Sequence, residues 1–335
     1  HPAKVVNVIS GPRVSRYELK PNDGIKFNAY KRFKENLQAA LKAERLTMYI
    51  PVPGKDVIGI EIPNKEPQTV GLRSLLEHPQ FMSNSQPLLL PIGLDVEGRA
   101  IFGDLKTMPH LLVSGTTGSG KSVFLRSLIL SLIYTMSQEQ LKMVFIDPKK
   151  VELSFFEGIP HLISPVVTDV KKASMILKSI VVEMEQRYDQ LKEAKMRNIE
   201  SYNKAYPDHP MPYIVVMIDE LADLMMTVRA DVEEAVTRIS QLARACGIHL
   251  IISTQRPTKK VISPTIKSNL PTRVAFSVSQ TIDSMTILDE PGAEELLGSG
   301  DMFYLPINGP KVRLQGCFVS DEEVEKVMEV IKQSR

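Results

Sequence analysis

Residues 110–126 read HLLVSGTTGSGKSVFLR, and they set the expectations for the rest of this 335-residue chain. The apolar run at 110–114 is typical of a buried strand, and the residues after Ser122 have the spacing of a helix. Between them, residues 115–122 match the phosphate-binding loop pattern G-x-x-x-x-G-K-[ST] in full. Because strand, loop and helix stand in the required order, we expect a nucleotide-binding domain.

The composition of this loop suits a bound polyphosphate. Glycines let the backbone wrap around phosphates, while successive N–H groups and the helix N-terminus supply positive potential. We expect Lys121 to reach the β and γ phosphates of ATP and the Ser122 hydroxyl to bind Mg²⁺. The other residues expected to contact the nucleotide are Gly115, Thr116, Thr117, Gly118, Ser119 and Gly120.

A second apolar run, 213–218, ends in the adjacent acids Asp219 and Glu220. Ligands of open α/β sheets bind at the carboxyl ends of the strands, so we expect Asp219 to bind Mg²⁺ through water. Glu220 is then expected to act as the general base toward the attacking water. The alternative is that this pair only caps the following helix. Asp147, which follows the run 144–146, is a secondary candidate at the same edge.

A third apolar run, 250–253, is followed by Thr254, Gln255 and Arg256. The Gln255 amide can hydrogen-bond both a γ phosphate and a water molecule, so we expect it to sense the state of the nucleotide. The alternative is that these polar residues simply leave the strand.

The length of the chain favours two domains, and we place the boundary at residue 85. Residues 1–85 show the order strand, strand, helix, strand, strand, which predicts a small α+β domain. In residues 86–335, apolar runs alternate with longer helical segments, which predicts a doubly wound α/β domain with a mostly parallel sheet. The strands expected there are 111–113, 143–146, 214–218, 250–253 and 274–277, and the helices are 122–135, 171–195, 232–246 and 321–333.

Charge and cysteine content exclude some classes of protein. The formal net charge of +2 excludes a histone-like protein, although residues 1–85 carry 13 Lys and Arg against 8 Asp and Glu. The chain contains 2 cysteines, too few for a disulfide framework, which favours the cytoplasm. We also expect no membrane contact by this fragment, because no apolar run approaches the roughly 18 residues of a membrane span. His1 in place of a start Met indicates that the numbering begins inside a longer protein.

Beyond the phosphate-binding loop, many blocks of the sequence resemble the motor region of the FtsK/SpoIIIE family of bacterial DNA translocases. They stand in the family's order and cover nearly the whole chain. The blocks are 146–149 with 152–153, 157–162, 165–169, 183–188, 218–225, 243–245 with 247–249, 254–257, 266–273 and 300–302, together with 11–14 and 51–55 in the first domain.

This resemblance implies a RecA-like ATPase domain that is preceded by a small domain and acts as a hexameric ring on double-stranded DNA in chromosome segregation. In such rings an arginine of the neighbouring subunit stabilises charge on the transferred phosphoryl group, and we favour Arg273 over Arg244 and Arg256. Many relatives also carry a membrane-anchoring amino-terminal part, which would place the parent protein at the inner face of the cell membrane.

The loop after Gln255 is the candidate DNA contact. Lys259 and Lys260 replace the small residue and the acid that are usual in relatives, and Lys267 follows shortly after. The alternative is that these lysines are only solvated. Met285 stands where relatives usually have Arg, so a phosphate contact by that arginine is lost here.

Two other functions compete with a DNA motor. Related ring ATPases move protein substrates or conjugating DNA, and they share the phosphate-binding loop and the adjacent acids. A nucleotide-gated scaffold that does not hydrolyse ATP is disfavoured by the presence of Glu220.

Overall fold

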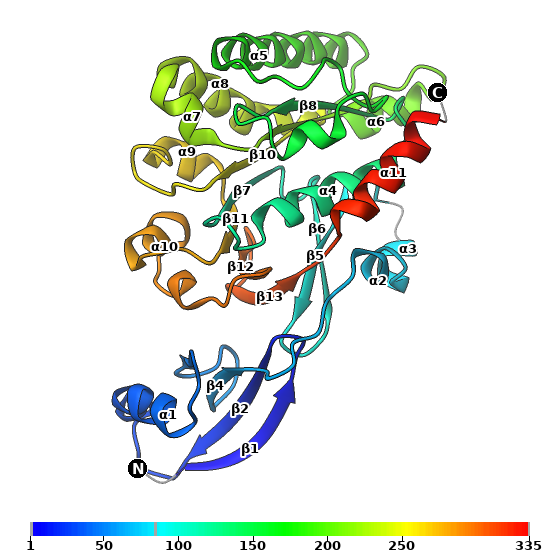
Figure 1. Cartoon of the computed structure of the whole chain (residues 1–335). Helices are drawn as coiled ribbons and strands as arrows, with labels where there is room; N and C mark the ends of the chain where they lie inside the picture. The colour runs from blue at the N-terminus through cyan, green and yellow to red at the C-terminus, as the bar shows by residue number, and fades with distance from the viewer. Residues whose placement is uncertain (1–2, 84–85, 334–335) are drawn as a thin grey trace.

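The computed structural model describes residues 3–83 and 86–333 (Figure 1). The first domain is a four-stranded antiparallel sheet with a 3₁₀ helix, η1 (Phe27–Phe33), and a short helix, α1 (Lys34–Ala40), between its second and third strands. The predicted order of strands and helices is therefore confirmed. In pairing order the strands are β1 (Ala3–Ser10), β2 (Val14–Pro21), β4 (Ile58–Pro63) and β3 (Thr47–Tyr49).

The second domain is built on a nine-stranded sheet. Five neighbouring strands run parallel, and all five predicted strands lie among them. In order these are β11 (Thr272–Phe276), β7 (His110–Ser114), β10 (Ile248–Thr254), β9 (Tyr213–Ile218) and β8 (Leu141–Ile146).

Four antiparallel strands extend the sheet beyond β11, and the sequence did not predict them. Outward from β11 they are β12 (Asp301–Leu305), β13 (Val312–Gly316), β5 (Leu89–Asp95) and β6 (Ala100–Asp104). This extension joins the start of the domain to its end, because β5 pairs with β13.

Helices cover both faces of this sheet, as expected for a doubly wound domain. One face packs against α4 (Lys121–Thr135), α2 (Leu72–Leu76) and α11 (Asp321–Gln333). The other face packs against α5 (Val170–Glu193), α7 (Leu221–Thr227), α8 (Arg229–Leu242) and α9 (Pro264–Asn269). The remaining helices are α3 (Pro79–Met82), η2 (Leu153–Phe156), α6 (Ile199–Ala205), η3 (Ala243–Cys246), α10 (Thr281–Leu288) and η4 (Ala293–Glu295).

The predicted domain boundary at residue 85 lies outside the described residues and stays a prediction. On its N-terminal side, Leu72 and Leu75 of α2 are buried in the core of the large domain. Gly71 also forms a parallel bridge with Phe318. Residues from about Val70 onward therefore pack with the large domain.

A buried chain of charges connects the two domains. Arg313 of β13 donates from Nη1 to Glu61 Oε2 of β4 at 2.8 Å and from Nη2 to Asp301 Oδ2 of β12 at 2.6 Å. The Arg16 Nε atom of β2 donates to the other oxygen of Glu61 at 2.8 Å. Because Glu61, Arg313 and Asp301 are buried, their charges depend on one another for compensation.

Candidate active site

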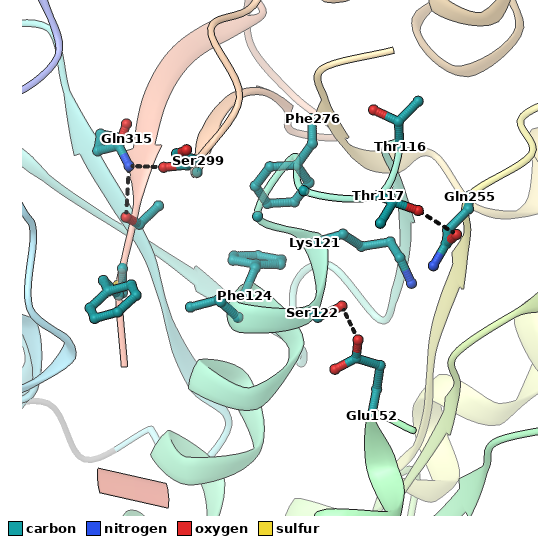
Figure 2. Close-up of a pocket in the computed structure, with 17 residues that line it drawn as sticks. Thr116, Thr117, Lys121, Ser122, Phe124, Glu152, Gln255, Phe276, Ser299 and Gln315 are labelled. Atoms are coloured by element: carbon teal, nitrogen blue, oxygen red, sulfur yellow. Dashed lines mark hydrogen bonds between the residues drawn. The ribbon is translucent and has the colours of Figure 1, made fainter. Parts of the chain in front are cut away.

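The phosphate-binding loop lies between β7 and α4, at the carboxyl end of the parallel strands (Figure 1). Gly120 has a φ of 107°, and a Cβ atom there would lie 2.4 Å from the backbone N of Gly300. Glycine is therefore required at this position for both conformation and space. The loop borders a cavity of about 340 Å³, which is large enough to admit a small ligand (Figure 2).

Lys121 begins α4, and its ammonium group is buried against the end of β9. Its Nζ atom donates to Asp219 Oδ1 at 2.9 Å, to the Asp219 backbone O at 3.2 Å and to Ser253 Oγ at 3.0 Å. Burial raises the pKa of Asp219, the carboxylates of Asp147 and Glu152 act in the same direction, and Lys121 opposes them. The structure thus brings together the lysine and the acid that the sequence placed at one site.

Ser122 points toward a carboxylate that the sequence analysis did not select. Its hydroxyl donates to Glu152 Oε1 at 2.6 Å, and Glu152 lines the cavity (Figure 2). The other oxygen of Glu152 accepts from Arg126 Nη2 at 2.9 Å. The position of Glu152 in the sequence could have indicated it, because it follows shortly after Asp147 at the end of β8.

Glu220 is buried and its carboxylate is fully engaged. Oε1 accepts from Thr254 Oγ1 at 2.6 Å and from the Ala222 backbone N at 3.2 Å, so the side chain caps α7. Oε2 accepts from Lys149 Nζ at 3.0 Å. Burial alone would raise the pKa of Glu220, but the hydrogen bonds from Thr254 and Lys149 outweigh it and hold the pKa below its usual value. Capping, the alternative interpretation, is therefore part of what Glu220 does.

Gln255 borders the cavity from the end of β10. Its Oε1 atom accepts from Thr117 Oγ1 at 3.2 Å, which joins the two loops directly (Figure 2). Asp147, Asp219 and Glu220 are not among the described residues that line the cavity, and Asp147 Oδ2 accepts from the Leu153 backbone N at 3.0 Å.

Arg273 does not reach the phosphate-binding loop within this chain. Its guanidinium donates to the backbone O atoms of Leu270, Ile287 and Lys267 and to Asp289 Oδ2, the last at 2.7 Å. It is nearly buried, whereas Arg244 and Arg256 are exposed.

The three lysines expected to contact DNA differ in their surroundings. Lys267 is half-buried and its Nζ donates to Asp289 Oδ1 at 2.7 Å. Lys259 and Lys260 are exposed in the loop after β10.

A segment far along the chain closes the cavity, and the sequence analysis did not place it at the site. The Gly300 backbone N donates to Ser119 O at 2.8 Å, and Gln315 Nε2 donates to Ser299 O at 2.9 Å. The aromatic ring of Phe276 and the segment 315–318 complete the lining (Figure 2). Apart from the block 300–302, these residues match no motif, so only the fold could reveal their position at the cavity.

The residues around the loop fit a phosphate group and Mg²⁺. Ser119 belongs to the glycine loop, and its Oγ is buried with no hydrogen-bond partner in the described part of the chain. The Ser122 hydroxyl and the Asp219 carboxylate offer hard oxygen donors of the kind that Mg²⁺ prefers.

The strand, the glycine loop and the acids at the ends of neighbouring strands together define a P-loop ATPase domain. The sequence profile of the FtsK/SpoIIIE family matches residues 71–259, and the profile of the FtsK alpha domain matches residues 2–64. The chain belongs to the FtsK/SpoIIIE family.

Curated relatives are similar along nearly the full chain. It is 49% identical over 98% of its length to the DNA translocase FtsK of Oceanobacillus iheyensis, covering 43% of that protein. It is 49% identical over 99% of its length to the DNA translocase SpoIIIE of Bacillus subtilis and covers 44% of it. The chain thus spans less than half the length of these relatives.

Solved structures include two similar ATPases. The pCW3 conjugation coupling protein TcpA, solved with ATPγS, matches with a TM-score of 0.71 and 26% sequence identity. The match covers 100% of this chain and 94% of the TcpA chain. The cytoplasmic domain of the type VII secretion ATPase EccC of Thermomonospora curvata matches with a TM-score of 0.69 and 28% sequence identity. The match covers 79% of this chain and 34% of the EccC chain. No helix in the described residues combines the length and apolar character of a membrane span.

Proposed function

We propose that this chain is the motor part of an ATP-driven translocase of double-stranded DNA of the chromosome-segregation type. The observation that carries the proposal is the pairing of Lys121 with Asp219 beside the cavity, in a chain whose relatives along nearly its full length are named DNA translocases. The similarity of the whole chain to TcpA solved with ATPγS supports nucleotide binding.

Each residue of the site has a role in this proposal. Backbone N–H groups of residues 115–120 bind the phosphates, and Lys121 leaves Asp219 to contact the β and γ phosphates. Ser122 and Asp219 would hold Mg²⁺, which neutralises charge on the phosphates when it is bound. Glu220 accepts a proton from the attacking water after one carboxylate oxygen is freed, and Gln255 links the phosphate to the next loop.

The assembly is proposed to be a homo-oligomeric ring, with six subunits as the family implies. An arginine of a neighbouring subunit would then complete the site. Arg273 remains our sequence-based candidate, and it could serve only if its bonds to Asp289 and to three backbone carbonyls are released. Arg244 and Arg256 are exposed, and Arg244 would have to release one bond, from its Nε to the Lys106 backbone O.

DNA contact is proposed for the loop that carries Lys259 and Lys260, because both side chains are exposed. Lys267 contributes only if it leaves Asp289. Contacts of this kind read phosphates and carry little sequence information.

The first test is the steady-state ATPase rate with Mg²⁺, with and without long double-stranded DNA. We expect DNA to raise the rate and added salt to reduce that rise, because phosphate contacts weaken with ionic strength. Lys121→Ala supplies the blank, since it keeps the fold's apolar core but loses the phosphate ligand.

An ATPase rate that exceeds that of Lys121→Ala but does not change when DNA is added would contradict the proposal. It would favour the second candidate, a related ATPase that moves protein, which the 28% identity to EccC supports. Stimulation by single-stranded but not by double-stranded DNA would instead favour a conjugation motor, in line with the similarity to TcpA.

A further inference from the structure

The Ser122 hydroxyl has one proton and two lone pairs, and the structure shows where the proton goes. It is donated to Glu152 Oε1 at 2.6 Å (Figure 2). A serine that binds a cation does so through a lone pair, so its proton must be accepted by another group. In this site that group is Glu152.

Asp219 does not accept this proton in the structure, because Ser122 donates to Glu152. Its Oδ1 atom accepts from Lys121 Nζ at 2.9 Å, and its backbone O accepts from Lys121 and from Ser253. The two carboxylates therefore have different partners: Asp219 accepts from Lys121, and Glu152 accepts from Ser122.

We propose that Glu152 is a positioning residue that orients the Ser122 hydroxyl so that its lone pairs face bound Mg²⁺. This inference rests on the proposed ATPase function, because it assigns a role within that site. Groups in the second coordination shell commonly fix the orientation of metal ligands in this way, and their loss weakens metal affinity.

The surroundings of Glu152 hold it in place for this role. Its Oε2 accepts from Arg126 Nη2 at 2.9 Å, and Arg126 also pairs with Asp321 at the start of α11. The guanidinium of Arg126 lies 4.7 Å from the ring centroid of Phe155. The Glu152 side chain is 17% exposed, so a carboxylate at the edge of the cavity is partly shielded from water.

The test is a Mg²⁺ titration of nucleotide binding by the full chain, followed with fluorescent ADP. Glu152→Ala is expected to raise the half-saturating Mg²⁺ concentration about 10-fold or more. Glu152→Gln is expected to restore most of the Mg²⁺ response, because the amide oxygen still accepts the serine proton.

Asp321→Ala is the matched control. It removes a carboxylate from Arg126 but leaves the contact between Glu152 and Ser122 intact, so its Mg²⁺ response is expected to match the wild type. A half-saturating Mg²⁺ concentration that is unchanged in Glu152→Ala would overturn the inference, and so would an equal change in Asp321→Ala.

The DNA-dependent ATPase rate is measured on the same preparations. A wild-type rate that does not respond to DNA contradicts the proposed function, whereas the Mg²⁺ titration decides the role of Glu152 without reference to DNA.

Discussion

Glu220 shows how one side chain serves both the fold and the proposed chemistry. Its Oε1 atom caps α7 through the Ala222 backbone N and accepts from Thr254, while Oε2 pairs with Lys149. Those bonds hold the pKa of Glu220 below its usual value, so the group is ionised at neutral pH. An ionised carboxylate can accept a proton only when one of its oxygens is released to water.

Replacing Glu220 by Gln is expected to lower ATP turnover by at least about 100-fold, because the amide cannot accept the proton of the attacking water. Nucleotide affinity is expected to stay near the wild-type value, since the Gln oxygen can still cap α7. Turnover and ADP binding measured together check this, with Asp223→Asn in the same helix turn as the control. Retained turnover in Glu220→Gln would remove Glu220 as the base.

The meeting of Lys121 and Asp219 could be predicted from the sequence, whereas the contacts of Glu152 and Arg273 could not. Strand ends of a parallel sheet meet at one edge, so a motif after β7 and acids after β9 had to lie close together. Glu152 lies in a loop, where the backbone path depends on tertiary packing. The bonds of Arg273 depend on how α9 and α10 pack, which no local pattern encodes.

At the level of elements, the parallel strands were predictable and the antiparallel ones were not. β9 is a continuous apolar run and β10 contains the apolar run 250–252, as expected of strands that are buried on both faces. β6 and β13 contain glycine and polar residues, which obscure the pattern. The pairing of β5 with β13 also joins segments that lie at opposite ends of the domain sequence.

Neighbouring strands β7 and β10 bury two histidines whose ring centroids lie 6.4 Å apart, His110 and His249. Burial lowers the pKa of His110 to about 3 and that of His249 to about 4. His110 Nδ1 accepts from the Leu250 backbone N at 3.0 Å, so this nitrogen must stay unprotonated in the fold. Both rings are therefore neutral in the folded protein.

Acid is expected to destabilise the fold through these histidines. Below pH 6.5 the unfolded chain binds protons that the folded chain excludes, so stability falls as pH drops toward 4 and is unaffected above 6.5. His249 alone is expected to lower the free energy of unfolding by about 3 kcal/mol when the pH falls to about 4. Urea unfolding of wild type and His110→Asn across this range checks it, since Asn keeps an acceptor for Leu250. Parallel pH profiles for the two proteins would contradict the assignment.

At the level of the whole molecule, Arg313 is the central charge between the domains. Arg313→Met is expected to cost about 3–5 kcal/mol of unfolding free energy, because it leaves the buried Glu61 and Asp301 without their shared partner.

Arg45→Ala is the matched comparison at the same interface. Arg45 is exposed and donates to the backbone O atoms of Glu294 and Leu296, so its loss is expected to cost at most about 1.5 kcal/mol. Urea unfolding of both variants measures the difference, and equal costs would show that the buried chain of charges does not stabilise the interface.

The Gly300 contact with Ser119 has a consequence for how this domain can be divided. The family profile ends at residue 259, yet part of the cavity wall comes from residues 299–318. A fragment trimmed to the profile would keep the phosphate-binding loop, both acids and Gln255, but the cavity would stand open on one side. The cavity is therefore completed only by a chain that returns to the loop after most of the domain has been formed.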